Sequence, residues 1–136
     1  MARDARVDRR RHGRGARTAS RLGPARPDHL AAAVRQTLAV LDRTLPTSMR
    51  SITFLVEDLP TVGELERARR CPLGRWEPGN PAQVILYRKP LESRCTTKLE
   101  LDILVRDTLA ELVGQAVGVR PTVAVPAYGE PDRRQV

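Results

Sequence analysis

The stretch VRDTLAELVGQAVG, residues 105–118, places two oxygen-bearing side chains one helical turn apart. Glu111 and Gln115 are at positions i and i+4, and residues with this spacing lie on the same face of a helix. Together they could give a metal ion one carboxylate and one amide oxygen. They are a poor zinc pair because zinc prefers imidazole and thiolate, and Mg²⁺ or Ca²⁺ would need further carboxylates. The simplest interpretation is a solvated polar edge of an amphipathic helix.

Few other residues offer catalytic or ligating chemistry. The chain has two histidines, His12 and His29, and neither has a partner at ligand spacing. The two cysteines, Cys71 and Cys95, lack a C-x-x-C step and are predicted to be small buried hydrophobic residues. The sequence also contains no G-x-S-x-G motif and no phosphate-binding glycine loop. We therefore expect no second catalytic centre.

Two amphipathic helices are predicted to form most of the core. The helix that carries Glu111 begins at the capping box Thr97-Lys98-Leu99-Glu100 and is expected to end at Gly118. An earlier helix begins after the N-cap Asp28 and is stopped by Pro46. The expected core stripe of the later helix consists of Leu101, Leu104, Val105, Thr108, Leu112 and Ala116.

Two short strands are predicted between these helices. Ile52, Phe54 and Val56 alternate with more exposed positions, and residues 83–88, QVILYR, form the second strand. Residues 58–82 are rich in proline and glycine and are expected to be mostly loop, with one helical turn at 63–70. A short turn is expected at PLESRC. The order predicts a small α+β domain with two main helices packed on a short β-sheet.

The charge is concentrated at the N-terminus. Residues 1–27 contain nine arginines and two aspartates, a local charge of +7, so only +1 of the total +8 remains for residues 28–136. This Arg-rich tail has no hydrophobic periodicity and is expected to be disordered. It could solubilise the chain or bind an acidic protein or nucleic acid by counterion release, with Arg9, Arg10, Arg11 and Arg14 as the candidate anion-binding residues.

The location expected from the sequence is the cytoplasm. Two cysteines are too few for a disulfide framework. The basic N-terminus is not followed by the apolar stretch of a signal peptide, and the longest apolar runs are too short to span a membrane. A membrane partner is therefore not expected.

Three stretches in order resemble the zincin-like metallopeptidase family, a group of small bacterial proteins with a minimal protease-like fold. ITFLVEDLP is similar to its first strand, VILYRKPLESRC to its second strand and turn, and VRDTLAELVGQAVG to the helix that bears H-E-x-x-H. The RRHGRG of the tail is similar to the start of an actinobacterial subgroup. The resemblance implies a minimal-zincin-like domain over residues 28–120, between the tail (1–27) and an irregular C-terminal segment (121–136).

The resemblance also implies where the family's active site would fall. The first zinc histidine of the family corresponds to Glu111, the catalytic glutamate to Leu112 and the second histidine to Gln115. The glycine after them is retained as Gly118, whereas the acidic third ligand corresponds to Pro121. A register shifted by one would put Ala110 and Gly114 at the histidine positions, so either alignment removes both imidazoles.

These replacements favour a family member that lacks both the zinc cofactor and the catalytic residues. Leucine cannot take a proton from zinc-bound water, and an apolar side chain at position 112 would let the cleft collapse into the core. Our first hypothesis is an inactive binding or scaffold module with an unidentified protein partner. One alternative is an active peptidase with an oxygen-ligand site, formed by Glu111 and two further acidic residues from among Glu57, Asp58 and Glu130. The other is a nucleic-acid-associated protein that binds through the tail.

Overall fold

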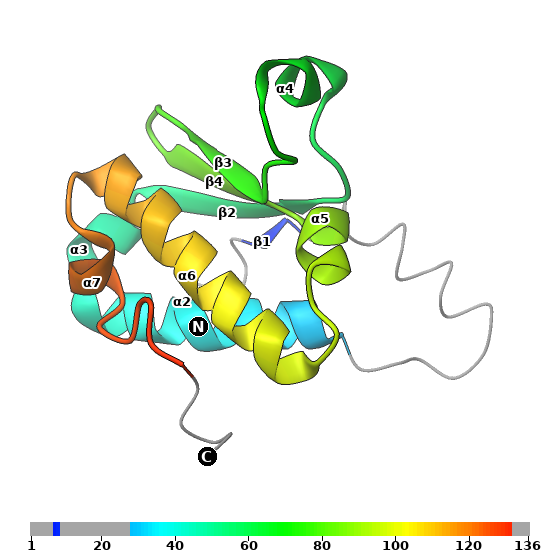
Figure 1. Cartoon of the computed structure of the whole chain (residues 1–136). Coiled ribbons are helices and arrows are strands. Elements are labelled where there is room, and N and C mark those ends of the chain that lie inside the picture. Colours follow the sequence, from blue (N-terminus) through cyan, green and yellow to red (C-terminus); the bar gives the residue numbers. More distant parts are fainter. Residues whose placement is uncertain (1–6, 9–27, 132–136) are drawn as a thin grey trace.

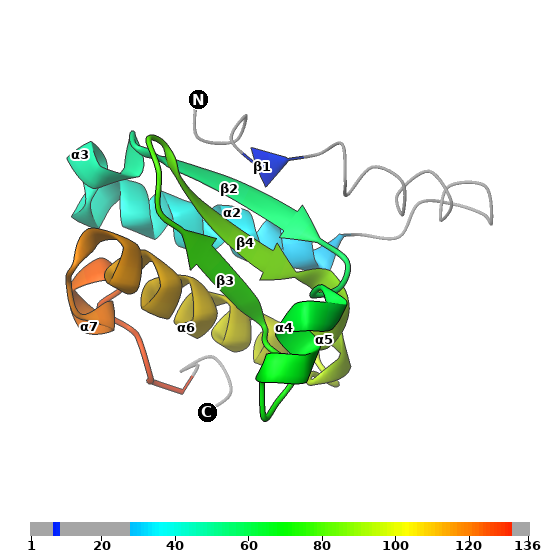
Figure 2. The ribbon, with the colours of Figure 1, turned by 90° about the horizontal axis from the view of Figure 1, so that it is seen from above.

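Two long helices pack on one face of a four-stranded sheet in the computed structural model, which describes residues 7–8 and 28–131 (Figure 1). A short helix, α4 (Val62–Arg67), lies on the other face, as the view turned by 90° also shows (Figure 2). The hydrophobic core lies between the sheet and the two long helices. The predicted α+β architecture is confirmed.

The first long helix, α2 (His29–Thr44), begins where the sequence predicts. Asp28 is its N-cap, and the Asp28 carboxylate accepts a hydrogen bond of 3.0 Å from the backbone N–H of Ala31. Such a cap satisfies a backbone donor that the first turn leaves unpaired. The helix ends at Thr44 with Leu45 as its C-cap, and Pro46 opens a separate single-turn helix, α3 (Pro46–Met49).

The second long helix, α6 (Lys98–Val117), has the predicted capping box. The Thr97 side chain accepts from the backbone N–H of Glu100, and the Glu100 side chain accepts from the backbone N–H of Thr97. Four residues of the predicted stripe are buried and two are half-buried. Burial extends well beyond the stripe, because the sheet, α2 and the C-terminal segment contact different sides of this helix; the additional buried residues are Asp102, Leu109, Ala110, Val113 and Gly114.

The sheet has the strand order β1-β2-β4-β3. Strands β2 (Ile52–Glu57) and β4 (Ala82–Tyr87) are parallel, β3 (Gly74–Glu77) runs antiparallel to β4, and β1 (Val7–Asp8) pairs parallel with β2. Residues that alternate along β2 face the helices, as predicted, and join the core with Val84 and Leu86 of β4. The opposite face of β4 carries Ile85 and Tyr87.

The structure corrects four local predictions. Strand β3 lies inside the expected loop 58–82; it is only four residues long and has no alternation that a pattern search could find. Helix α4 occupies residues 62–67 rather than 63–70, and helix α5 (Arg88–Ser93) replaces the expected turn. Helix α7 (Pro121–Ala124) adds one turn to the segment predicted as irregular.

The predicted tail, residues 1–27, lies outside the described residues except for Val7 and Asp8, which form β1. Its candidate anion-binding residues, Arg9, Arg10, Arg11 and Arg14, are all outside, so their role stays a prediction. No helix in the described ranges is long and apolar enough to cross a membrane.

Candidate functional site

The outer face of α6 carries the two oxygen-bearing side chains that the sequence singles out. Glu111 and Gln115 are both exposed and one turn apart, as expected for a polar edge. The Glu111 carboxylate is engaged within the chain, since Glu111 Oε2 accepts a hydrogen bond of 2.5 Å from the Tyr128 hydroxyl. This contact holds the C-terminal segment against α6.

Residues 125–131, which we call the C-terminal strap, are attached to α6 at two further points. The Gly129 N–H donates to Asp107 Oδ1 at 3.1 Å, and the Arg106 guanidinium donates to the Glu130 carbonyl at 2.5 Å. Arg106 and Asp107 also form an ion pair of 2.9 Å with each other. The strap therefore lies along the helix face that holds Asp107 and Glu111, which are themselves one turn apart.

Leu112 points away from that face and into the protein. It is 9% exposed and belongs to the hydrophobic core. Gly74 at the start of β3 lies close to it: a Cβ added there would lie 2.9 Å from Leu112 Cδ1 and 2.5 Å from the Ile85 carbonyl oxygen. The expectation that an apolar side chain at position 112 joins the core is confirmed.

The end of α6 is fixed by glycine at two positions. Gly118 has φ 78, a left-handed conformation that glycine adopts without the strain a Cβ brings, and its N–H donates to the Gly114 carbonyl. Gly114 also permits a close approach, because a Cβ there would lie 2.7 Å from the Val119 carbonyl oxygen. Pro121 follows as the first residue of α7 and has no side-chain donor atom for a metal.

The donors on this face do not fit a zinc ion. Zinc sites use imidazole, thiolate or carboxylate ligands, and catalytic sites use three of them. The three positions Glu111, Gln115 and Pro121 offer one carboxylate, which already accepts from Tyr128, one amide and a proline. Within residues 7–8 and 28–131, no three histidine, cysteine, aspartate or glutamate side chains are grouped so that they could hold a metal ion.

The acidic residues considered as further oxygen ligands form no metal-binding group with Glu111 in the described part of the chain. Glu57 ends β2 and lies 3.8 Å from the Arg75 guanidinium, on the sheet face opposite α6. Asp58 follows it in the exposed turn. Glu130 belongs to the strap, where its backbone carbonyl accepts from Arg106.

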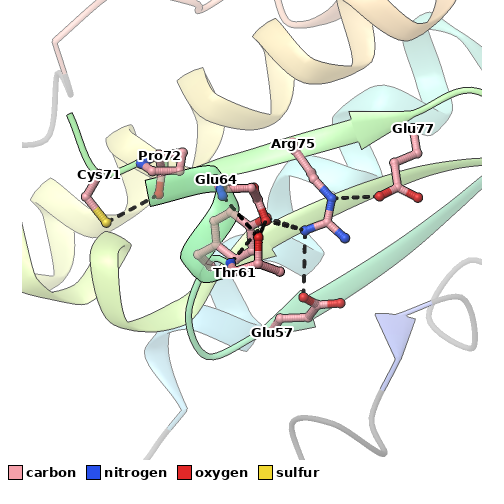
Figure 3. Close-up of polar contacts among 8 residues, drawn as sticks. Glu57, Thr61, Glu64, Cys71, Pro72, Arg75 and Glu77 are labelled. Carbon is pink, nitrogen blue, oxygen red and sulfur yellow. Dashed lines mark hydrogen bonds and ion pairs between the residues drawn. The ribbon is translucent and has the colours of Figure 1, made fainter. Parts of the chain in front are cut away.

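A second polar cluster, which sequence reasoning missed, lies between α4 and the outer face of the sheet (Figure 3). The Tyr87 hydroxyl donates to Glu64 Oε2 at 2.5 Å and accepts from the Arg75 guanidinium. Arg75 also pairs with Glu64 at 3.2 Å and with Glu77 at 2.8 Å. The capping box Thr61-x-x-Glu64 was the sequence feature that could have located it.

The environment of this cluster shifts the pKa values of its members, among them Tyr87 and Glu64. Burial, followed by the hydrogen bond to Glu64, raises the pKa of Tyr87 to about 12. Partial burial acts to raise the pKa of Glu64, but hydrogen bonds from Tyr87 and Thr61 together with the Arg75 charge bring it below its usual value. Glu64 is thus a stable carboxylate and Tyr87 a stable phenol near neutral pH, which suits a structural clamp.

The two cysteines and His29 were minor candidates. His29 is exposed at the start of α2, as expected. Cys71 is exposed, which corrects the prediction that it is buried: it lies in the loop between α4 and β3, where the chain turns between Arg70 and Pro72. Cys95 is half-buried beside the core, and burial raises the pKa of its thiol.

Comparison with known proteins identifies one family. The sequence model of the zincin-like metallopeptidase family matches residues 49–123, more than half of the chain. The match runs from the end of α3 into α7 and includes the β2–β4 sheet, β3 and all of α6. No curated protein matches the chain.

Proposed function

The chain belongs to the zincin-like metallopeptidase family, and we propose that it uses the family fold as a binding module without zinc-peptidase chemistry. The proposal rests on the residues that α6 carries in place of H-E-x-x-H. These are Glu111, Leu112, Val113, Gly114 and Gln115.

The observation that carries the proposal is the burial of Leu112. A zincin's glutamate at this position takes a proton from water, and a leucine has no atom that can do so. Leu112 instead fills the space beneath Gly74 of β3 and forms part of the core. The side chain that would be the general base is here a packing residue, so restoring a metal alone would not restore hydrolysis.

A second observation supports the loss of metal binding. The first-ligand position, Glu111, is tied to the strap through Tyr128, and the third-ligand position is Pro121. A domain that has a packed core but lacks metal donors at these positions is better suited to binding than to zinc chemistry. We place this module in the cytoplasm, in keeping with its two free cysteines.

The Arg-rich tail favours an acidic partner as a second candidate contact. Its +7 charge would release counterions from nucleic acid or attract an acidic protein. Replacing Arg9, Arg10, Arg11 and Arg14 by serine in the full chain should abolish salt-sensitive retention on a DNA or RNA column if the tail binds nucleic acid. Unchanged retention would reject that role.

Metal stoichiometry tests the proposal directly. The untagged protein is dialysed against zinc, its metal content is measured by elemental mass spectrometry, and its melting temperature is followed across divalent ions. We expect no stoichiometric metal and no ion-dependent shift in melting temperature, together with no cleavage of unfolded casein.

Two variants make the result specific. Glu111→Ala removes the only carboxylate at a family ligand position, and Asp107→Ala removes another carboxylate on the same face one turn earlier. About one zinc per chain that is lost in Glu111→Ala but kept in Asp107→Ala would overturn the proposal and return the chain to the active peptidases.

A further inference from the structure

The connection between α4 and β3 carries an exposed run of arginines. Residues 67–70 read Arg-Ala-Arg-Arg and are all exposed, and so is Cys71, which follows them. Neither helix nor strand is formed between the end of α4 and the start of β3. We call residues 68–73 the arginine loop. Exposed loops with polar residues are the places where proteases cut folded proteins most readily.

The backbone of the arginine loop is open to a protease. Within residues 7–8 and 28–131, Arg69 and Arg70 form no hydrogen bond and no ion pair, through either backbone or side chain. Ala68 is already extended, with φ -98 and ψ 142. A bound peptide that pairs with its receptor as an added strand has the same extended form. A protease can therefore take up this segment at a low cost of local unfolding.

Other arginines in loops are less suited to cleavage. Among the described residues, three more arginines lie outside helices and strands, namely Arg50, Arg94 and Arg120. The N–H groups of Arg50 and Arg94 donate to carbonyls three residues earlier, at 3.2 and 3.3 Å. Arg120 is followed by Pro121, whose ring removes the N–H of the bond that would be cut. The arginine loop is thus the accessible one.

The spacing of the arginines suits a protease with acidic subsites. In trypsin an aspartate in the S1 pocket selects a basic residue immediately before the cut, which would be Arg70 here. Arg69 and Arg67 are the second and fourth residues before the same bond. In an extended chain these two side chains point to the same side, opposite to Arg70. They can therefore share one acidic surface of the protease while Arg70 enters its pocket.

A cut after Arg70 would leave the two halves of the protein together. Strand β2, in the first half, pairs with β4, in the second half, over six residue pairs. Helices α2 and α6 share one hydrophobic core in the same way. Glu64 of α4 lies before the cut, whereas Arg75 and Tyr87, which bind its carboxylate, lie after it (Figure 3). These contacts would become contacts between two chains.

We propose that the arginine loop is a processing site, at which a serine protease that reads paired arginines hydrolyses the bond between Arg70 and Cys71. Water is added across this peptide bond, so that Arg70 gains a carboxylate and Cys71 an amino group. The product is a two-chain protein, and Cys71 is the first residue of its second chain. The inference goes beyond the proposed function and does not depend on whether the chain binds zinc.

Limited digestion of the full chain under native conditions tests the position of the cut. The enzyme is a proprotein convertase, which reads arginine at the first, second and fourth positions before the bond. We expect the fragment 71–136, identified by mass spectrometry and by 2-cyanobenzothiazole, which labels an N-terminal cysteine. Cuts within residues 1–27 shorten the chain but do not produce this fragment.

Two variants make the digestion specific. Arg70→Gln should slow the release of fragment 71–136 about a hundredfold or more, because the charged pocket of the protease loses its partner. Arg94→Gln is the matched control: it removes an exposed arginine from another loop, which also donates to the Cys71 carbonyl at 3.3 Å. It should leave the rate unchanged or raise it. Both positions are exposed or in loops, and circular dichroism checks that both variants fold.

The association of the halves is measured on the cut wild type. The two fragments should elute together in size-exclusion chromatography in buffer and separately in denaturant. The amides of residues 62–67 should keep their NMR chemical shifts, because Glu64 still binds the sheet. The chain isolated from the cells that naturally produce it should contain the same fragment with a free Cys71 amine.

Four results would overturn the processing site. They are a first cut within residues 28–131 at another bond, equal release of fragment 71–136 from Arg70→Gln, separation of the fragments in buffer, and an uncut Arg70–Cys71 bond in all of the naturally produced chain.

Discussion

The Tyr128 hydroxyl donates a hydrogen bond of 2.5 Å to Glu111 Oε2, so that the C-terminal strap is fastened to α6 at the position that we propose corresponds to the first zinc ligand of the family. The anchor of the strap is apolar: Ala124 and Val125 are buried in the core, and the Thr44 hydroxyl donates to the Ala124 carbonyl at 2.6 Å. Glu111 thus contributes to holding the chain end.

Removing the Tyr128 hydroxyl should loosen the strap without unfolding the domain. In Tyr128→Phe the ring remains but the hydrogen bond to Glu111 is lost, so the Gly129 amide, which donates to Asp107, should exchange with solvent about tenfold faster or more. The measurement is amide hydrogen exchange by NMR, with the core amide of Val105 as an internal reference. Equal protection of Gly129 in both proteins would show that the strap is held by Arg106 and Asp107 alone.

The stability that the hydrogen bond between Tyr128 and Glu111 contributes should decrease at high pH. The hydrogen bond to Glu111, with slight burial, raises the pKa of Tyr128 above its ordinary value of 10.0 in the folded state. Its stabilisation is therefore fully present below pH 10.0 and is lost as pH rises through the raised pKa. The difference in unfolding free energy between wild type and Tyr128→Phe should be constant at neutral pH and disappear at high pH. A difference that grows above pH 10.0 would contradict this assignment.

Tyr87 should titrate well above the ordinary pKa of a tyrosine. The chain has two tyrosines, so Tyr128→Phe leaves Tyr87 as the only phenol, and its tyrosinate absorbance should rise near pH 12. Burial and the hydrogen bond to Glu64 raise the pKa of Tyr87 in the folded state. The protonated Tyr87 therefore contributes its full share of the unfolding free energy below pH 10.0, and this contribution is lost as the pH rises from 10.0 to about 12. Absorbance that rises at pH 10.0 in the folded protein would mean that α4 is not clamped to the sheet. Glu64→Gln in the same background should lower the midpoint while burial keeps it above 10.0.

Leu112 should behave as a core residue. Leu112→Ala should lower the unfolding free energy by about 2–5 kcal/mol, as measured by chemical denaturation, because it leaves a cavity beneath β3. Leu112→Met keeps the volume and should cost under about 1.5 kcal/mol. Leu112→Glu should cost more than Leu112→Ala because a carboxylate would be buried without a partner. A fully stable Leu112→Glu would show that the site still accommodates the catalytic residue.

Gly74 of β3 lies opposite Leu112, and a side chain at this position should be unfavourable. In Gly74→Ala the new Cβ would meet the Ile85 carbonyl at 2.5 Å and Leu112 Cδ1 at 2.9 Å. Strand β3 must shift, so we expect a loss of about 1–3 kcal/mol. Combining it with Leu112→Ala should recover only part of that loss, because the Ile85 backbone cannot give way. Full recovery in the double variant would assign the whole clash to Leu112.

Much of this fold could be predicted from the sequence, because its long elements carry strong local signals. The Asp28 cap, the Thr97–Glu100 capping box and the alternation in β2 each describe interactions within a few residues. Strand β3 could not be predicted, because its four residues lie in a segment between two prolines and form a strand only by pairing with β4. The polar cluster was missed for the same reason: Glu64, Arg75 and Tyr87 are brought together by the sheet and by α4 rather than by their spacing.

Restoring the two family ligand positions should restore part of the metal binding. Glu111→His/Gln115→His places two imidazoles at i and i+4 on α6, the arrangement that a helix offers to zinc. Zinc at a concentration 100-fold above its dissociation constant would then stabilise the variant by about 2.7 kcal/mol, a shift that a chelator should reverse. Gln115→His alone should show a much smaller shift and serves as the matched control. Peptidase activity should stay absent from the double variant, because the side chain of Leu112 cannot act as a general base and that of Pro121 cannot ligate a metal. A double variant that binds no zinc would mean that the strap closes this face of α6, and adding Tyr128→Ala should then open it.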